Sequence, residues 1–344
     1  MERFTGLLGI VLILGVSFLM SNNRKAINYR TVGVGLLLQV GLAVFILKTE
    51  VGQATFQWLG DSINTLLGQA DKGAQFVFGS LVDRKLMSQA FGAGNDYIFF
   101  FKVVPTIIFV AVLVNMFYHL GVLQRVVSTM GKGVHWLMGV SGAEALSNVA
   151  STFVGQVEAQ IMIKPYLKNM TNSELMASMT GSFACIAGGV MAVYISLGVP
   201  AAYLLAASLM AAPGALVISK IMFPETEKSE TQGMVKMDII KTHANLVDAV
   251  AAGASEGLKV GLNVIAMLIG FIALIALVDL GLGHIGAWIN MPTLSMNLIL
   301  GKVFSVFAFA MGVPAQDVEV AGALKPNFAK SERRDGANSP IPPI

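Results

Sequence analysis

The 344-residue sequence is 55% hydrophobic and 12% charged, with a mean hydropathy of +0.71. Soluble domains carry about 25% charged residues, so this composition excludes an ordinary soluble protein and indicates an integral membrane protein. The net charge of +3 is small and spread over loops, which gives no support for nucleic-acid binding, and a lone cysteine, Cys185, excludes an intrachain disulfide.

Several apolar windows approach or reach the ~20 residues that cross about 30 Å of hydrocarbon. Backbone polar groups in lipid must be bonded internally, and these windows are too long and too continuous for barrel strands. We therefore predict an all-α, polytopic membrane fold. The windows are residues 4–20, 31–47, 98–118, 175–198, 201–222 and 260–282.

The first window is followed by the basic residues Arg24, Lys25 and Arg30, whereas a signal peptide carries its positive charge ahead of the apolar run. We predict a retained helix, with residues 1–48 forming two transmembrane helices. Short loops rich in lysine and arginine stay cytoplasmic, so the N-terminus is predicted to lie outside. Residues 49–97 are amphipathic in places and are predicted to lie along the outer interface.

Residues 98–222 are predicted to form a transmembrane core that contains a re-entrant hairpin at about 133–163. Basic residues on both sides of this segment place its two ends at the cytoplasmic face. These residues are Arg125, Lys132, Lys164 and Lys168. Non-helical backbone at membrane depth is tolerated only inside protein or beside a water-filled cavity, which is the broken-helix design of secondary transporters.

The predicted tip of the hairpin is the polar stretch Gly155–Gln160, sequence GQVEAQ. An ionisable side chain at membrane depth is costly and usually functional, so Glu158 beside Gln156 is the best candidate for contact with a transported solute. A structural carboxylate paired within the helix bundle is the alternative.

The second half of the chain is predicted to contain an interfacial segment, a further transmembrane helix and a polar tail. Residues 223–259 form a cytoplasmic or interfacial segment, in which an apolar stripe at Val247, Val250 and Ala254 predicts a surface-lying helix. Residues 260–324 hold a further transmembrane helix and the start of the second half of the transport domain. Residues 325–344 are an atypical polar tail.

Three further ionisable residues carry predictions. Lys102 lies near the start of a span and is expected to snorkel to the interface, with a gating pair as the alternative. Glu144 is either a proton-relay site or half of an ion pair that stabilises the hairpin. Asp279 is expected at a solvated helix terminus.

Ordered motifs over roughly residues 1–324 resemble the concentrative nucleoside transporter family. The motifs are GQVEA at 155–159, KPYL at 164–167, MTNSEL at 170–175, AGGV at 187–190, AAP at 211–213, SKIMFPETE at 219–227, AMLI at 266–269 and MGVP at 311–314. The resemblance implies a homotrimer in which each protomer combines re-entrant hairpins with broken helices. It also implies nucleoside uptake driven by a sodium or proton gradient, with no other cofactor.

Carried over by position, the resemblance places Gln156, Val157 and Glu158 against the nucleoside and Val190 near its base. The family's sodium site maps to Ser151, Val154, Cys185 and Ile186.

Three positions depart from the family pattern. Val157 replaces a hydroxyl residue, Ser151 stands where sodium-coupled members have asparagine, and the Cys185 thiol is a poor substitute for an oxygen ligand. Both sodium and proton therefore stay open as the coupling ion.

The family's second hairpin and last helices have no counterpart in the sequence after residue 324, and we interpret the polar tail as the result of a frameshift or early stop. The predicted function is cation-coupled nucleoside uptake by alternating access across the bacterial cytoplasmic membrane. The alternatives are a transporter of another small polar solute and a transport-inactive truncated member. A membrane enzyme is disfavoured because the sequence offers no nucleophile and base pair, metal cluster or phosphate loop.

Overall fold

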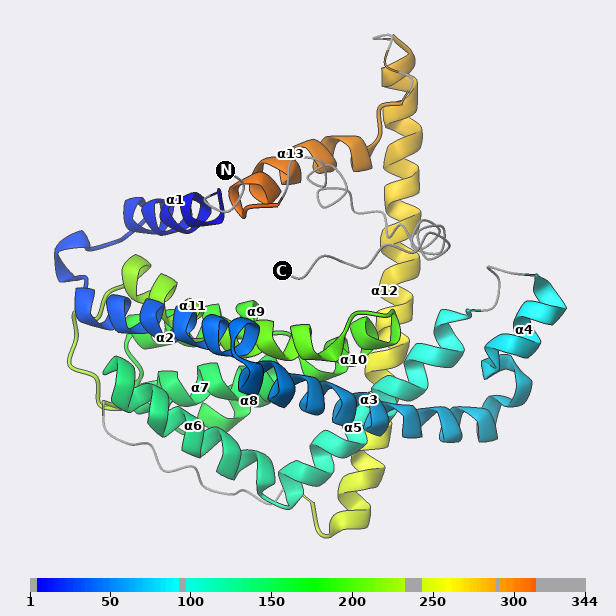
Figure 1. Ribbon diagram of the computed structural model, residues 1–344, viewed down its shortest axis with the longest axis horizontal. Helices are drawn as coiled ribbons and strands as arrows, with labels where there is room; N and C mark the ends of the chain where they lie inside the picture. The colour runs from blue at the N-terminus through cyan, green and yellow to red at the C-terminus, as the bar shows by residue number, and fades with distance from the viewer. Residues whose placement is uncertain (1–4, 93–96, 233–242, 289–290, 292, 314–344) are drawn as a thin grey trace. The chain divides into compact units, whose positions relative to one another are not determined.

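The computed structural model describes residues 5–92, 97–232, 243–288, 291 and 293–313. Within these residues every regular element is helical, which confirms the predicted all-α fold (Figure 1). The chain divides into two compact units, and each is described by itself. Among the described residues, the larger unit comprises 16–91, 97–232 and 243–264, and the smaller one comprises 5–15, 92, 265–288, 291 and 293–313.

Most helices follow one another with connections of a few residues, and three 3-10 turns lie between helices of the described residues. The α-helices are α1 (Thr5–Leu19), α2 (Tyr29–Lys48), α3 (Glu50–Phe78), α4 (Arg84–Phe91), α5 (Phe99–His119), α6 (Val122–Met138), α7 (Gly142–Phe153), α8 (Gln156–Ile163), α9 (Asn172–Ala184), α10 (Gly188–Ser196), α11 (Ala201–Met222), α12 (Leu246–Trp288) and α13 (Met296–Ala310). The 3-10 turns are η2 (Arg24–Ala26), η3 (Gly79–Val82) and η4 (Leu167–Asn169).

Five helical segments of the described residues are long and apolar enough to cross a membrane. They are Tyr29–Lys48, Phe99–His119, Asn172–Ser196, Ala201–Met222 and Leu246–Trp288. Two further apolar helices of the described residues are shorter. One is α1, which corresponds to the predicted window 4–20, and the other is α13, which lies in the predicted segment 260–324. The tail at 325–344 lies outside the described residues.

The predicted interfacial segment 49–97 is mostly the 29-residue helix α3. One face of α3 is buried at Gly52, Phe56 and Gly60, which are spaced four residues apart and therefore share a side of the helix. This face packs against α2, α5 and α11, while Phe76 on the helix is 92% exposed. The helix is amphipathic as predicted, and its place in the bilayer stays a prediction.

The predicted hairpin is built by α7 and α8. Helix α6 continues to Met138 and ends at Gly139, which has φ of +66°, so the hairpin begins at Gly142 rather than at about 133. Residues 142–152 of α7 are all buried. The hairpin is therefore an internal element of the larger unit.

The window 175–198 was expected to be one continuous helix, and the structure corrects this. Helix α9 ends at Ala184, α10 begins at Gly188, and both Cys185 and Ala187 have extended backbone angles. The sequence through the break, Ala-Cys-Ile-Ala, contains no proline or glycine and is compatible with a helix. The break therefore has no local signal in the sequence. We call residues 185–187 the α9–α10 break.

The surface-lying helix predicted within 223–259 does not exist as a separate element. Residues 246–259 are the first part of α12, one continuous helix of 43 residues (Figure 1). The side that packs on α5 carries Gly253, Gly257 and Gly261: a methyl group at Gly257 would lie 2.6 Å from the Ile108 Cα atom. Small residues four apart let two helix backbones approach closely, so the glycine side of α12 packs on α5. The apolar stripe used for the prediction, Val247, Val250 and Ala254, belongs to the same long helix.

Asp279 is not at a helix terminus. It lies inside α12, and its Oδ1 atom accepts a hydrogen bond from the backbone N–H of Met296 at 2.6 Å. Both residues belong to the smaller unit. The carboxylate thus satisfies one of the free N–H groups at the start of α13.

Candidate functional site

The tip of the hairpin is a single sharp turn between α7 and α8. Gly155 has φ of +107°, a conformation that residues with a side chain rarely adopt. A methyl group at this position would lie 3.0 Å from the Ala187 Cβ atom and 3.1 Å from Glu158 Oε2. The tip of the hairpin therefore rests directly against the α9–α10 break, and glycine is required both by the backbone angle and by the contact.

Two helices begin at this contact. Helix α8 starts at Gln156 and α10 starts at Gly188, and neither N-cap residue, Gly155 or Ala187, caps its helix with a side chain. The first N–H groups of a helix have no partner within the helix and carry partial positive charge. The backbone of the tip and of the break thus offers hydrogen-bond donors to a polar solute.

The predicted substrate residues surround this point. Gln156 and Glu158 are exposed in the first turn of α8, and Val157 lies between them in the same turn. Val190 lies in the first turn of α10 and is 44% exposed. An amide, a carboxylate and an apolar side chain are therefore present at the two helix starts.

The residues of the predicted ion site come from the end of α7 and from the α9–α10 break. Ser151 is fully buried and Val154 is 4% exposed, while Cys185 and Ile186 are half-buried. The Thr152 hydroxyl oxygen lies 3.6 Å from the Cys185 sulfur, which brings the two segments together.

The donor atoms of this set are only partly suited to sodium. Ser151 Oγ donates to the Ser147 carbonyl at 2.9 Å and lies 3.4 Å from Ser182 Oγ, so two hydroxyl oxygens are close to one another. Hydroxyl and carbonyl oxygens suit a hard cation, whereas the Cys185 thiol does not. Val154 and Ile186 have only their backbone carbonyls to offer.

A row of buried hydroxyl groups connects α7 to α9 below the tip. Ser147 Oγ lies 2.6 Å from Ser178 Oγ, and Ser151 pairs with Ser182 one turn further on. Gln160 of α8 joins this row, because its Nε2 atom lies 2.7 Å from Ser182 Oγ and its Oε1 atom accepts from Ser178 Oγ at 3.0 Å. We call these five residues the hydroxyl seam.

Sequence reasoning missed the hydroxyl seam, although a signal existed. Ser147 and Ser151, and likewise Ser178 and Ser182, are four residues apart and so share a helix face. The offset of 31 residues between the pairs shows that α7 and α9 run in the same direction. Both helices therefore start at the same end of the larger unit.

At that end each helix starts with a capping box. The Ser141 N–H donates to Glu144 Oε1 at 2.7 Å, and the Ser141 hydroxyl accepts from the Glu144 N–H at 3.3 Å. Thr171 and Glu174 repeat the arrangement with distances of 2.8 and 3.2 Å. Such reciprocal pairs satisfy two of the free N–H groups at a helix start.

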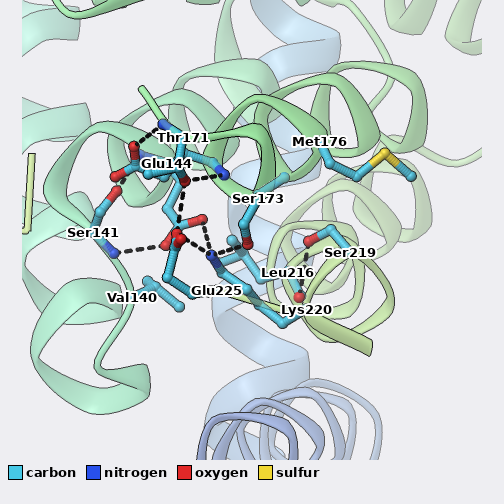
Figure 2. Close-up of polar contacts among 12 residues, drawn as sticks. Val140, Ser141, Glu144, Thr171, Ser173, Met176, Leu216, Ser219, Lys220 and Glu225 are labelled. Carbon is cyan, nitrogen blue, oxygen red and sulfur yellow. Dashed lines mark hydrogen bonds and ion pairs between the residues drawn. The ribbon is translucent and has the colours of Figure 1, made fainter. Parts of the chain in front are cut away.

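Lys220, near the end of α11, lies beside the first capping box (Figure 2). Its Nζ atom is 2.8 Å from Glu144 Oε2 and donates to Ser173 Oγ at 2.8 Å, and it lies 3.7 Å from Glu225 Oε2. The side chains of Lys220 and Glu144 are 8% and 1% exposed. Of the two alternatives for Glu144, the structure shows the ion pair, and its stabilising role stays a prediction.

The segment after α11 covers the second capping box. Glu225 Oε2 accepts from the Thr171 hydroxyl at 2.7 Å, and Glu174 Oε1 accepts from Ser229 at 2.5 Å and from Thr231. Together with Lys220 these contacts form a largely buried polar cluster, which we call the hairpin base. It is defined by Ser141, Glu144, Thr171, Ser173, Glu174, Lys220, Glu225, Ser229 and Thr231.

Lys102 has a partner as well. Its Nζ atom lies 2.5 Å from Asp71 Oδ1 of α3, and the two side chains are 30% and 47% exposed. The side chain therefore ends in an ion pair between α5 and α3, and a gating role for that pair stays a prediction.

Long apolar helices, a helical hairpin with a largely buried base, and an exposed amide and carboxylate next to a turn that contacts a helix break are typical of a secondary membrane transporter. Three family models cover most of the chain. They are the Na+-dependent nucleoside transporter N-terminus at residues 8–81, a gate domain described as nucleoside recognition at 100–201, and the Na+-dependent nucleoside transporter C-terminus at 203–325.

Curated relatives agree with the family models. An uncharacterized transporter of Haemophilus influenzae is 41% identical over 325 residues, covering 94% of this chain and 76% of the relative. The nucleoside permease NupC of Helicobacter pylori is 36% identical over 316 residues, covering 92% and 74%. Sodium/nucleoside cotransporter 1 of the mouse is 37% identical over 324 residues, which are 94% of this chain and 48% of that protein.

Solved structures show the same fold. CNTnw in an inward-facing substrate-bound state matches with a TM-score of 0.88 and 38% identity, covering 94% of this chain and 75% of that chain. A substituted form of CNTnw in an outward-facing state matches with a TM-score of 0.87 and the same coverage. The chain belongs to the concentrative, Na+-dependent nucleoside transporter family, and it is a transporter rather than an enzyme.

Proposed function

We propose that this protein takes up nucleosides across the bacterial cytoplasmic membrane, driven by a sodium or proton gradient. The observation that carries the proposal is the exposure of Gln156 and Glu158 at a glycine turn held against the α9–α10 break. NupC of Helicobacter pylori and sodium/nucleoside cotransporter 1 of the mouse, both similar over more than 90% of this chain, support the nucleoside as substrate.

The chemistry of the site suits such a substrate. The Gln156 amide both donates and accepts, so it can bond to the edge of a nucleobase, and the Glu158 carboxylate accepts from ribose hydroxyl groups. Val190 offers an apolar surface for the face of the base. Val157 contributes no hydroxyl group, so selectivity rests on the residues on either side of it.

We propose alternating access as the mechanism, with the hairpin and the α9–α10 region moving against a scaffold in a homotrimer, and with the N-terminus outside. Matches to CNTnw structures in both inward-facing and outward-facing states support two accessible conformations of this fold. In transporters of this kind the substrate lies near the bilayer midplane, at a break between helices.

The coupling ion is either sodium or a proton. Sodium is supported by the family models and by the adjacent oxygens of Ser151 and Ser182. A proton stays open as the alternative because the Cys185 thiol at the mapped site is a poor ligand for sodium. Uptake driven separately by a sodium gradient at equal pH and by a pH gradient without sodium identifies the ion.

The test is accumulation of labelled uridine and adenosine by cells that lack their own nucleoside transporters and express this chain. We expect uptake that disappears when the ion gradient is collapsed. We also expect Glu158→Gln to lower uptake by about tenfold or more without lowering membrane abundance, because the variant loses one hydrogen bond to a charged group. The exposed Glu50 in the first turn of α3 supplies a matched control, Glu50→Gln, which leaves uptake unchanged.

Absence of uptake from protein that reaches the membrane would overturn the proposal for this chain. Unchanged uptake in the Glu158→Gln variant would overturn the assignment of the site. Uptake of another labelled polar solute that excess uridine fails to inhibit would favour a different substrate.

A further inference from the structure

Gln160 is the polar residue of α8 whose side chain bonds within the hydroxyl seam. Its amide oxygen accepts from Ser178, and its amide nitrogen lies 2.7 Å from Ser182 Oγ and 3.3 Å from Ser147 Oγ. One side chain thus joins all three helices around the tip, since Ser147 is on α7 and the other two serines are on α9. The proposed function gives these bonds no role.

We propose that Gln160 is a positioning residue for nucleoside binding, which sets the rotation of α8 and thereby the placement of Gln156 and Glu158. This inference rests on the proposed function. Gln160 lies four residues after Gln156, so the two side chains share one face of α8 a single turn apart. A bond that fixes one turn of a helix therefore fixes the side chain one turn above it.

The length of α8 makes such a fixing point necessary. The helix has eight residues, and helices this short are marginal without tertiary contacts. Its apolar contacts come from Ala159, Met162 and Ile163, which are 0%, 7% and 0% exposed. Apolar packing is non-directional, whereas three hydrogen bonds to two helices specify one rotation.

The glutamine is matched to its partners atom by atom. An amide offers two N–H donors and one carbonyl acceptor, and the three serine contacts use one acceptor and both donors. Methionine has nearly the same length and shape but forms none of these bonds. The variant Gln160→Met therefore removes the positioning bonds while largely keeping the packing.

The experiment measures KM and maximal rate for labelled uridine, with the rate divided by the amount of transporter in the membrane. We expect Gln160→Met to raise KM roughly tenfold or more, because a binding group must be held within about 0.5 Å, and to change the normalised rate less than about threefold. A change in membrane abundance alone, with KM unaltered, would show a purely structural role and overturn the proposal.

A matched control and a double variant sharpen the result. Gln124 is also a buried glutamine, 2% exposed, and its Nε2 atom donates to the Tyr118 carbonyl at 2.8 Å, a bond that involves no residue of α8 or of the hydroxyl seam. We expect Gln124→Met to affect abundance but not KM. If Gln160 acts through α9, Ser178→Ala raises KM in the same direction, and adding it to Gln160→Met raises KM little further.

Additive effects of the two substitutions on KM would overturn the assignment of α9 as the anchor. The outcomes also separate this inference from the proposed function. Absence of uridine uptake in the unsubstituted chain contradicts the proposed function itself. Uptake with an unaltered KM in Gln160→Met contradicts only the positioning role.

Discussion

The two ends of the hairpin use polar residues in opposite ways. At the hairpin base, Glu144 is 1% exposed, caps its own helix and forms an ion pair with Lys220. At the tip, Gln156 and Glu158 are exposed on a helix that no side chain caps. Buried polar groups are stable only when they have partners, whereas a binding site needs groups that are open to the solute. The paired groups at the hairpin base therefore fix the hairpin in place, whereas the exposed groups at the tip are free to bind a solute.

This difference predicts that substitutions at the base lower stability and that substitutions at the tip lower transport. The variants below are ordered by the size of the expected effect, and each one compares the stability of the purified protein with uptake per transporter in the membrane.

The largest effect is expected from Lys220→Met. The substitution leaves the Glu144 carboxylate buried without its cation, which costs about 3–5 kcal/mol of stability. We expect a strong loss of membrane abundance and a lower melting temperature in detergent. The double variant Lys220→Met with Glu144→Leu removes both charges and should recover much of the loss. Failure of Lys220→Met to lower the melting temperature would show that the ion pair does not anchor the hairpin.

Gly155→Ala should have a smaller effect, at the opposite end of the hairpin. Alanine is strained at φ of +107°, and its methyl group would press on Ala187 at 3.0 Å. Strained backbone of this kind costs about 1–3 kcal/mol, so the turn is expected to shift. We expect uridine uptake to fall more than abundance does. Equal losses in both measurements would contradict the assignment of the tip to binding.

Thr171→Ala tests the second capping box. Loss of an N-cap hydroxyl group costs typically about 1 kcal/mol, and this hydroxyl also donates to Glu225 at 2.7 Å. We expect a modest fall in melting temperature with an unchanged KM for uridine. A changed KM would mean that the base acts on the binding site as well as on stability.

Lys102→Met should have the smallest effect on stability. The pair with Asp71 is short, 2.5 Å, but both side chains are partly exposed, and such pairs contribute about 0.2–1 kcal/mol. A melting temperature close to that of the unsubstituted protein is expected. A large loss of uptake at normal abundance would instead support the gating role of this pair.

Local signals in the sequence predicted much of the fold and the tip of the hairpin. Gly155, followed by Gln156 and Glu158 inside an apolar protein, marked the turn, because glycine permits a sharp turn and an ionisable residue at membrane depth is costly unless it has a function. The break at Cys185–Ala187 and the packing of α12 on α5 through Gly257 escaped prediction. Both features depend on which helix packs against the segment, and an apolar sequence contains no local signal that identifies its packing partner.

The sequence by itself determined the membrane class, the all-helical fold, the family and the place of the polar tip. Composition, the length of apolar segments and the order of motifs are properties of the linear sequence, and they do not depend on which helices pack together. The tertiary structure alone decided the partners of the buried polar groups, such as Lys220 for Glu144 and Ser178 and Ser182 for Gln160. These partners are 18 or more residues apart, so only the packing of the helices brings them within the range of a hydrogen bond.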